Sequence, residues 1–129
     1  MGLFEEWAEK SAETRAKFHP GSGRSSLNSN PWAELSPELA NVVNDMAMGG
    51  VYSNPALELK TRALCTVAAL VALGEETYAV NWMRNALNVG ATQEELVTII
   101  DQLFVYIGTP KTVSGFRAVT KAVSAEGGR

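Results

Sequence analysis

The sequence predicts an all-α protein of about six helices. Apolar residues recur at helical spacing along most of the chain, and the alternation of apolar and polar residues that is typical of strands is hard to find. Residues that start and stop helices separate the apolar stretches. With 129 residues, the chain has the length of one domain that buries roughly two-thirds of its unfolded surface.

The first part of the chain predicts a charged helical arm, residues 1–18. Its apolar stripe is modest and begins at Phe4 and Trp7. Residues 19–32 are dense in Gly, Ser, Asn and Pro, a composition that is typical of a flexible connector. We therefore divide the chain into this arm, this connector and a main helical domain at residues 33–125.

The next predicted helix has a clear beginning and end. Ser36 can cap it, Pro37 suits its first turn, and Gly49 and Gly50 are expected to end it. Its apolar stripe consists of Leu39, Val42, Val43 and Met46.

Residues 56–73 predict the most apolar helix of the chain. After its first turns it has almost no polar face. A helix that is apolar nearly all round must be covered on most sides. For so small a domain, this favours either the centre of the fold or an interface between copies of the chain.

Three further helices complete the predicted domain. Gly74 is expected to stop one helix, and the next begins with Glu75. Thr92 and Glu95 form a T-x-x-E capping box, which predicts the start of another helix. The last predicted helix has Pro110 in its first turn.

Composition and charge argue against several classes of protein. The hydrophobic fraction of 46% is that of an ordinary globular protein. The net charge of −3, without a basic block, argues against nucleic acid as a partner. No apolar run reaches the roughly 20 residues of a membrane helix, and a single cysteine requires no oxidising compartment. We therefore expect a cytoplasmic protein that binds neither nucleic acid nor membrane.

The central part of the chain contains a series of motifs. They are a short entry motif (Val51-Tyr52-Ser53 with Pro55), Leu59-Lys60-Thr61-Arg62, Arg84, Ala86-Leu87-Asn88-Val89-Gly90-Ala91-Thr92 and Tyr106-Ile107-Gly108-Thr109-Pro110. Through these motifs the chain resembles the carboxymuconolactone decarboxylase family, whose all-helical fold is shared with the alkylhydroperoxidase AhpD. The resemblance implies an oligomer, a homotrimer or a homohexamer, and a chemistry that needs no cofactor.

The resemblance also shows which chemical groups are missing. AhpD-type relatives carry two cysteines and a histidine where this chain has Glu75, Tyr78 and Trp82. A thiol peroxidase cycle needs the two thiols, so we exclude it. Decarboxylase relatives usually keep the histidine, and they often have a glutamate just before the entry motif, at the position of Gly50. The basic residue that often precedes the proline of that motif is Asn54 here.

Several residues remain as candidates for a site. We consider Cys65, Arg62 and Gln102 as catalytic candidates, and as ligand-binding candidates Tyr52, Trp82, Met48, Arg84 and Tyr106. No metal site is expected, because the isolated His19 has no partner at metal-ligand spacing and is interpreted as a solvated or capping residue.

Four of these candidates have a structural interpretation beside the functional one. The two arginines either hold a ligand carboxylate or pair with Glu58, Glu75 or Glu95. Cys65 is either a small core residue, in which case burial keeps its thiol inert, or it faces a pocket near Asp45 or Asp101. Trp82 either fills the ancestral pocket or forms one wall of an apolar site beside Tyr52, Met48 and Met83, where methionines suit varied ligands.

Two functions are compatible with the sequence. The first is a divergent enzyme of the carboxymuconolactone decarboxylase type that acts on a small cyclic or aromatic-derived acid or lactone. The second is a non-catalytic helical oligomer that binds a hydrophobic small molecule or serves assembly. A fold does not fix a function, so the resemblance alone does not decide between them.

Overall fold

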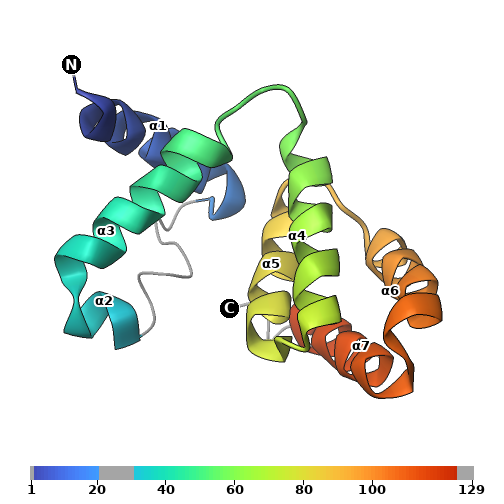
Figure 1. Ribbon diagram of the computed structural model, residues 1–129. Coiled ribbons are helices and arrows are strands. Elements are labelled where there is room, and N and C mark those ends of the chain that lie inside the picture. The colour runs from blue at the N-terminus through green and yellow to red at the C-terminus, as the bar shows by residue number, and fades with distance from the viewer. Residues whose placement is uncertain (1, 21–30, 125–129) are drawn as a thin grey trace. The chain divides into compact units, whose positions relative to one another are not determined.

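The structure is a computed structural model that describes residues 2–20 and 31–124. All regular secondary structure in these two ranges is helical, which confirms the predicted all-α class (Figure 1). The elements are α1 (Leu3–Phe18), α2 (Pro31–Leu35), α3 (Pro37–Asp45), the π-helix η2 (Met46–Val51), α4 (Leu59–Leu73), α5 (Glu76–Asn88), α6 (Gln93–Ile107) and α7 (Thr109–Val123).

The helices gather into two compact units, Met1–Glu58 and Leu59–Arg129. In the first unit, α1 packs against η2 and α3, and α2 packs against α3. In the second unit, α4, α5, α6 and α7 pack on one another. Positions 21–30 of the expected connector lie outside the described residues, and the division of the chain made from sequence stays a prediction.

Gly49 and Gly50 do not end a helix, so the sequence prediction was wrong at this point. The helical backbone runs through both glycines as η2, and the Tyr52 amide donates a hydrogen bond to the Ala47 carbonyl at 2.8 Å. A Cβ on Gly49 would lie 1.9 Å from the Trp7 carbonyl oxygen. A glycine is therefore needed here because α1 lies directly against the backbone of η2.

The apolar helix predicted at residues 56–73 begins later, at Leu59. The Asn54 side-chain oxygen accepts a hydrogen bond from the Ala56 amide at 2.9 Å, an Asx turn that competes with helical hydrogen bonding. Within its unit, α4 buries a line of small apolar residues and leaves a second line exposed. The buried residues are Ala63, Val67 and Val71, and the exposed ones are Cys65, Ala69 and Leu73.

The helix boundaries of the second unit follow the sequence signals. Gly74 and Gly90 have positive φ angles of 77° and 107° after α4 and α5, as expected for glycines at helix C-termini. The capping box is present, because the Thr92 hydroxyl accepts from the Glu95 amide at 3.1 Å and the Thr92 amide donates to the Glu95 carboxylate at 2.9 Å. In the first unit, Ser36 precedes α3 without a side-chain capping bond.

Helix α7 crosses the second unit at Gly115, which is buried. A Cβ at this position would lie 2.9 Å from Val71 Cγ1 on α4 and 3.3 Å from Ile100 Cγ2 on α6. Three helices therefore meet at a point where only a hydrogen atom fits without movement. Val71 is 3% exposed and Ile100 is fully buried, so neither side chain has free volume to enter.

We predict that Gly115→Ala lowers the stability of the second unit. Alanine gains about 1 kcal/mol in helix propensity over glycine, but overpacking a filled core costs about 1–3 kcal/mol. The midpoint of urea unfolding should therefore fall. Thr120→Ala, an exposed change on the same helix, is the control and should shift stability by less than about 0.5 kcal/mol. A Gly115→Ala variant that is more stable than the wild type would contradict the tight crossing.

Candidate functional site

The candidate residues are distributed over both units. Met48 and Tyr52 belong to the first unit, and the other six belong to the second. Each unit is described by itself.

In the first unit, Met48 and Tyr52 lie on and directly after η2. Met48 is 3% exposed, and Tyr52 is half-buried. The Tyr52 ring meets the fully buried Phe18 ring of α1 edge to face, with 5.7 Å between centroids and an interplanar angle of 90°. His19 follows as the C-cap residue of α1, which agrees with the capping interpretation, and burial lowers the pKa of its imidazole.

Trp82 is buried on α5, the helix that packs against α4 and α7. Its side chain is 8% exposed, and the adjacent Met83 is fully buried. Residue 82 therefore holds an indole inside the second unit. An indole N–H donates a hydrogen bond but does not titrate near neutral pH, so this side chain is not a general acid or base.

Arg84 is half-buried on the same helix, and it pairs with no acidic residue in ranges 2–20 and 31–124. Its Nη2 donates to the Lys121 carbonyl of α7 at 3.5 Å, and among the described residues its buried Nε has no hydrogen-bond partner. Burial lowers the pKa of the guanidinium. Pairing of Arg84 with Glu75 or Glu95 was therefore a wrong interpretation. Glu95 instead pairs with Lys60 at 2.9 Å.

Arg62 is half-buried in the first turns of α4, where its carbonyl accepts a hydrogen bond from the Thr66 hydroxyl at 3.1 Å. It lies near the start of the same helix as Lys60, whose ammonium joins α4 to the capping box of α6. Arg62 and Arg84 thus come from two packed helices, α4 and α5, and each guanidinium is only partly solvated.

Cys65, Gln102 and Tyr106 lie at the surface of the second unit. Cys65 is exposed, so its interpretation as a core residue was wrong for the single chain. The reason is its register on α4, because it lies on the exposed line with Ala69 and Leu73. Tyr106 is 84% exposed, and Gln102 is exposed on the same helix. The structure does not enclose these three side chains with Trp82.

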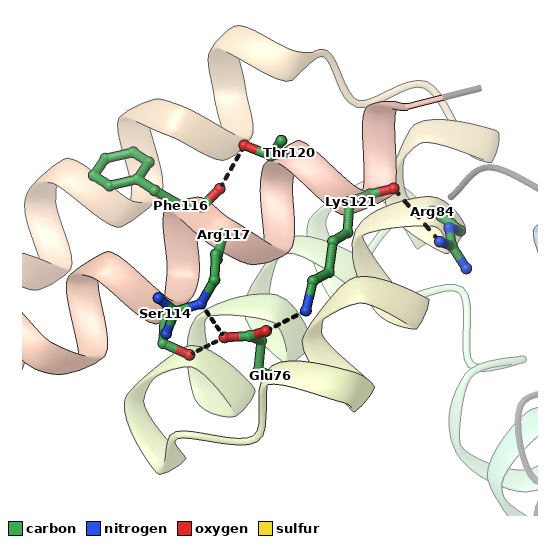
Figure 2. A network of polar contacts seen from close by, with 7 residues as sticks. All are labelled: Glu76, Arg84, Ser114, Phe116, Arg117, Thr120 and Lys121. Atoms are coloured by element: carbon green, nitrogen blue, oxygen red, sulfur yellow. Dashed lines mark hydrogen bonds and ion pairs between the residues drawn. The ribbon is translucent and has the colours of Figure 1, made fainter. Parts of the chain in front are cut away.

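A cluster of polar contacts around the Glu76 carboxylate joins α5 to α7 (Figure 2). The sequence did not predict this cluster. Glu76 opens α5 and accepts hydrogen bonds from Ser114 Oγ at 2.9 Å, Arg117 Nε at 2.9 Å and Lys121 Nζ at 2.6 Å. Lys121 also supplies the carbonyl that Arg84 contacts. The hydrogen bonds from Lys121, Arg117 and Ser114 hold the pKa of Glu76 at about 2. Ser114, Arg117 and Lys121 lie 38–45 residues from Glu76 in the sequence. No local sequence motif therefore predicts these contacts.

A surface hollow of about 320 Å³ lies between α4 and the start of α6. Its lining combines apolar side chains with the polar residues of the capping box, and it contains none of the candidate residues. The lining residues are Leu64, Thr92, Glu94, Glu95, Thr98 and Ile99.

The described part of the chain contains neither a candidate metal site nor a candidate membrane-spanning helix. No group of three or more His, Cys, Asp or Glu side chains in residues 2–20 and 31–124 is placed to hold a metal ion. No helix in these ranges has the length and hydropathy to cross a membrane.

Comparison with known proteins identifies the family. The model of the carboxymuconolactone decarboxylase family matches residues 37–121, which include all eight candidate residues. The chain belongs to this family.

A relative with a known activity is the 4-carboxymuconolactone decarboxylase of Acinetobacter baylyi (strain ATCC 33305 / BD413 / ADP1). It is 35% identical over 77 residues, which cover 60% of this chain and 58% of that protein. The match therefore spans about three-fifths of the relative's length. These comparisons confirm the resemblance inferred from the motifs.

As a carboxymuconolactone decarboxylase family member, the chain combines two features in the second unit. It has half-buried cations on α4 and α5, and a buried indole on α5. The partly solvated guanidinium groups can bind a carboxylate. The described part of α5 provides no imidazole or thiol to move a proton.

We predict that Glu76→Gln weakens the second unit in a pH-dependent way. The folded-state pKa of about 2 lies below the ordinary value of 4.5. The ionised Glu76 therefore stabilises the fold fully above about pH 4.5, and this contribution is lost as the pH falls toward 2. Urea midpoints measured from pH 7 to pH 2 should show a gap between wild type and variant that closes at low pH.

Glu75→Gln is the matched control, because Glu75 is exposed and precedes the same helix. It should leave the urea midpoint nearly unchanged across this range. A gap for Glu76→Gln that stays constant from pH 7 to pH 2 would contradict the role assigned to the ionised carboxylate.

Proposed function

We propose that this carboxymuconolactone decarboxylase family member acts on a small cyclic or aromatic-derived acid or lactone. The family match carries the proposal, because it includes the entry motif and both arginines. The similarity to a 4-carboxymuconolactone decarboxylase supports a lactone acid as the substrate class. No cofactor or metal is part of the proposal.

In this proposal, Arg84 and Arg62 bind the ligand's carboxylate. A hydrogen bond to an ionised group is stronger than a neutral one, and low solvation strengthens it further. The unpartnered buried Nε–H of Arg84 is a donor that a carboxylate oxygen can satisfy. The flat apolar face of Trp82 suits packing against an unsaturated ring.

Decarboxylation places a clear demand on the remaining groups. The bond between the carboxylate carbon and the ring breaks, CO2 leaves, and the electron pair stays on the ring carbon, which must take up a proton. Trp82 does not supply that proton. We propose that water supplies this proton, or the exposed Cys65 thiol, which regains its proton from water, so turnover should be slow.

We predict that Trp82→His increases the decarboxylation of 4-carboxymuconolactone. A positioned general acid contributes typically 10²–10⁴-fold to a rate, so we expect a gain on the order of 10² over the wild type. CO2 release is the measurement. Trp82→Phe is the matched control, because it removes the indole without adding a titratable group.

Equal rates for Trp82→His and Trp82→Phe would show that restoring an imidazole at residue 82 does not restore the chemistry. If neither the wild type nor Trp82→His releases CO2, the decarboxylase proposal fails.

A second candidate function, a non-catalytic self-assembling protein, is favoured by the apolar surface of α6. Phe104 and Val105 are exposed, and Tyr106 follows them at the end of the helix. The exposed line of α4, which includes Leu73, adds to this surface. Large exposed apolar patches mark sites of association. We therefore propose that the chain forms a homotrimer or a homohexamer, with or without catalysis.

We predict that light scattering at micromolar concentration gives a mass of three or six chains. Val105→Glu should lower this mass, because it places a charge on the exposed face of α6. Thr98→Glu, on the same helix but lining the hollow beside Glu94 and Glu95, is the control and should leave the mass unchanged. A monomeric mass for the wild type would contradict the assembly proposal but would not bear on the enzyme proposal.

A further inference from the structure

Helix α1 lies against the backbone of η2 at the start of the entry motif. A Cβ on Gly49 would lie 1.9 Å from the Trp7 carbonyl oxygen, and a Cβ on Gly50 would lie 2.7 Å from Trp7 Nε1. The first obstacle is helix backbone, which does not move unless α1 moves. The second is the edge of an indole ring, which can rotate.

This contact has a consequence for the side chain that residue 50 can carry. With α1 docked, the edge of Trp7 occupies the space that any side chain at residue 50 would enter, because Nε1, Cε2 and Cδ1 lie 2.7, 3.0 and 3.2 Å from a Cβ there. A side chain at position 50 therefore requires the Trp7 indole to rotate or α1 to move. Gly49 and Gly50 together form the docking seat of α1.

The interface that holds α1 on this seat is poorly suited to permanent packing. The buried residues of α1 are Ser11, Thr14 and Phe18, so two of the three are hydroxyl side chains. Among the described residues, the buried Ser11 Oγ has no hydrogen-bond partner, and a buried polar group without a partner destabilises the docked state.

The other side of the interface and the exposed face of α1 lead to the same conclusion. Asn44 on α3 is 1% exposed, and its Oδ1 likewise has no partner among the described residues. The large apolar side chains of Leu3 and Phe4 remain exposed at 58% and 65%. The buried apolar side chain of α1 is Phe18, at the end of the helix. The N-terminal part of α1, without such an anchor, should open at low free-energy cost compared with a core helix.

We propose that α1 is a reversible cover of the entry motif. Docked, it lies on η2, in which Met48 is buried, and packs Phe18 on the ring of Tyr52. Undocked, it exposes the backbone of η2 at Gly49 and Gly50 and the ring of Tyr52 to a small aromatic or apolar ligand. The chemical class of that ligand rests on the proposed function, whereas the opening of α1 does not.

Hydrogen–deuterium exchange of the full chain tests the opening directly. In the wild type, amides of α1 should exchange at least 10-fold faster than those of α3. Gly49→Ala should raise the exchange of α1 a further 10-fold, because its Cβ collides with backbone. Gly50→Ala should raise it less, because the indole can rotate. Ser11→Ala removes an unpartnered hydroxyl and should slow the exchange of α1.

Gly2→Ala is the matched glycine control, because a Cβ there meets only Glu5 Oε1 at 3.9 Å. It should leave the exchange of α1 unchanged. Equal exchange of α1 and α3 in the wild type would overturn the proposal. Equal acceleration of amide exchange in α1 and α3 of the Gly49→Ala variant would also overturn it. Either result would mean that α1 and α3 open together as one cooperative unit.

The exposed surface is tested with the aromatic sulfonate dye 1-anilinonaphthalene-8-sulfonate. Gly49→Ala should raise its fluorescence about 3-fold over the wild type, whereas Ser11→Ala should lower it, and unchanged fluorescence in Gly49→Ala would overturn the ligand-facing part. These readouts do not depend on catalysis. If 4-carboxymuconolactone is not turned over but the amides of α1 exchange faster than those of α3, the proposed function is rejected. The proposal that α1 is a reversible cover then still holds.

Discussion

The packing of the second unit depends on the helix crossing at Gly115, where α7 has no side chain and lies against α4 and α6. The hydrogen atom of Gly115 allows Val71 and Ile100 to approach the α7 backbone, and this crossing closes the unit around its core. The Glu76 carboxylate then fixes α5 to α7 through three hydrogen bonds. Because Trp82 and Arg84 are both on α5, their positions follow from these two contacts.

The chemistry that the second unit can perform is limited by the side chains that α4 and α5 carry. Trp82 of α5 is buried and does not titrate near neutral pH. The cations of Arg62 and Arg84 remain, and burial keeps them partly desolvated. Such a site is better equipped to bind an acid than to protonate a carbanion, so binding and catalysis have to be measured separately.

The sequence predicted those features that depend on neighbouring residues. The all-α class, the capping box at Thr92 and the stops at Gly74 and Gly90 all arise from local hydrogen bonding and backbone freedom. The features it did not predict depend on residues distant in sequence. The cluster around Glu76 joins α5 to α7, and exposure of Cys65 depends on which side of α4 its neighbours cover.

Gly49 and Gly50 show why the same residue pair supports two interpretations. From sequence alone, two glycines after an apolar stripe indicate the end of a helix. The other reason for a glycine, close approach of a second backbone, requires knowledge of where α1 lies. Here the second reason decides, because no other residue fits under the Trp7 carbonyl. Apart from the fully buried Phe18, α1 docks on bare backbone through hydroxyl side chains, which add little apolar burial. It can therefore leave this seat without unfolding the helices beneath it.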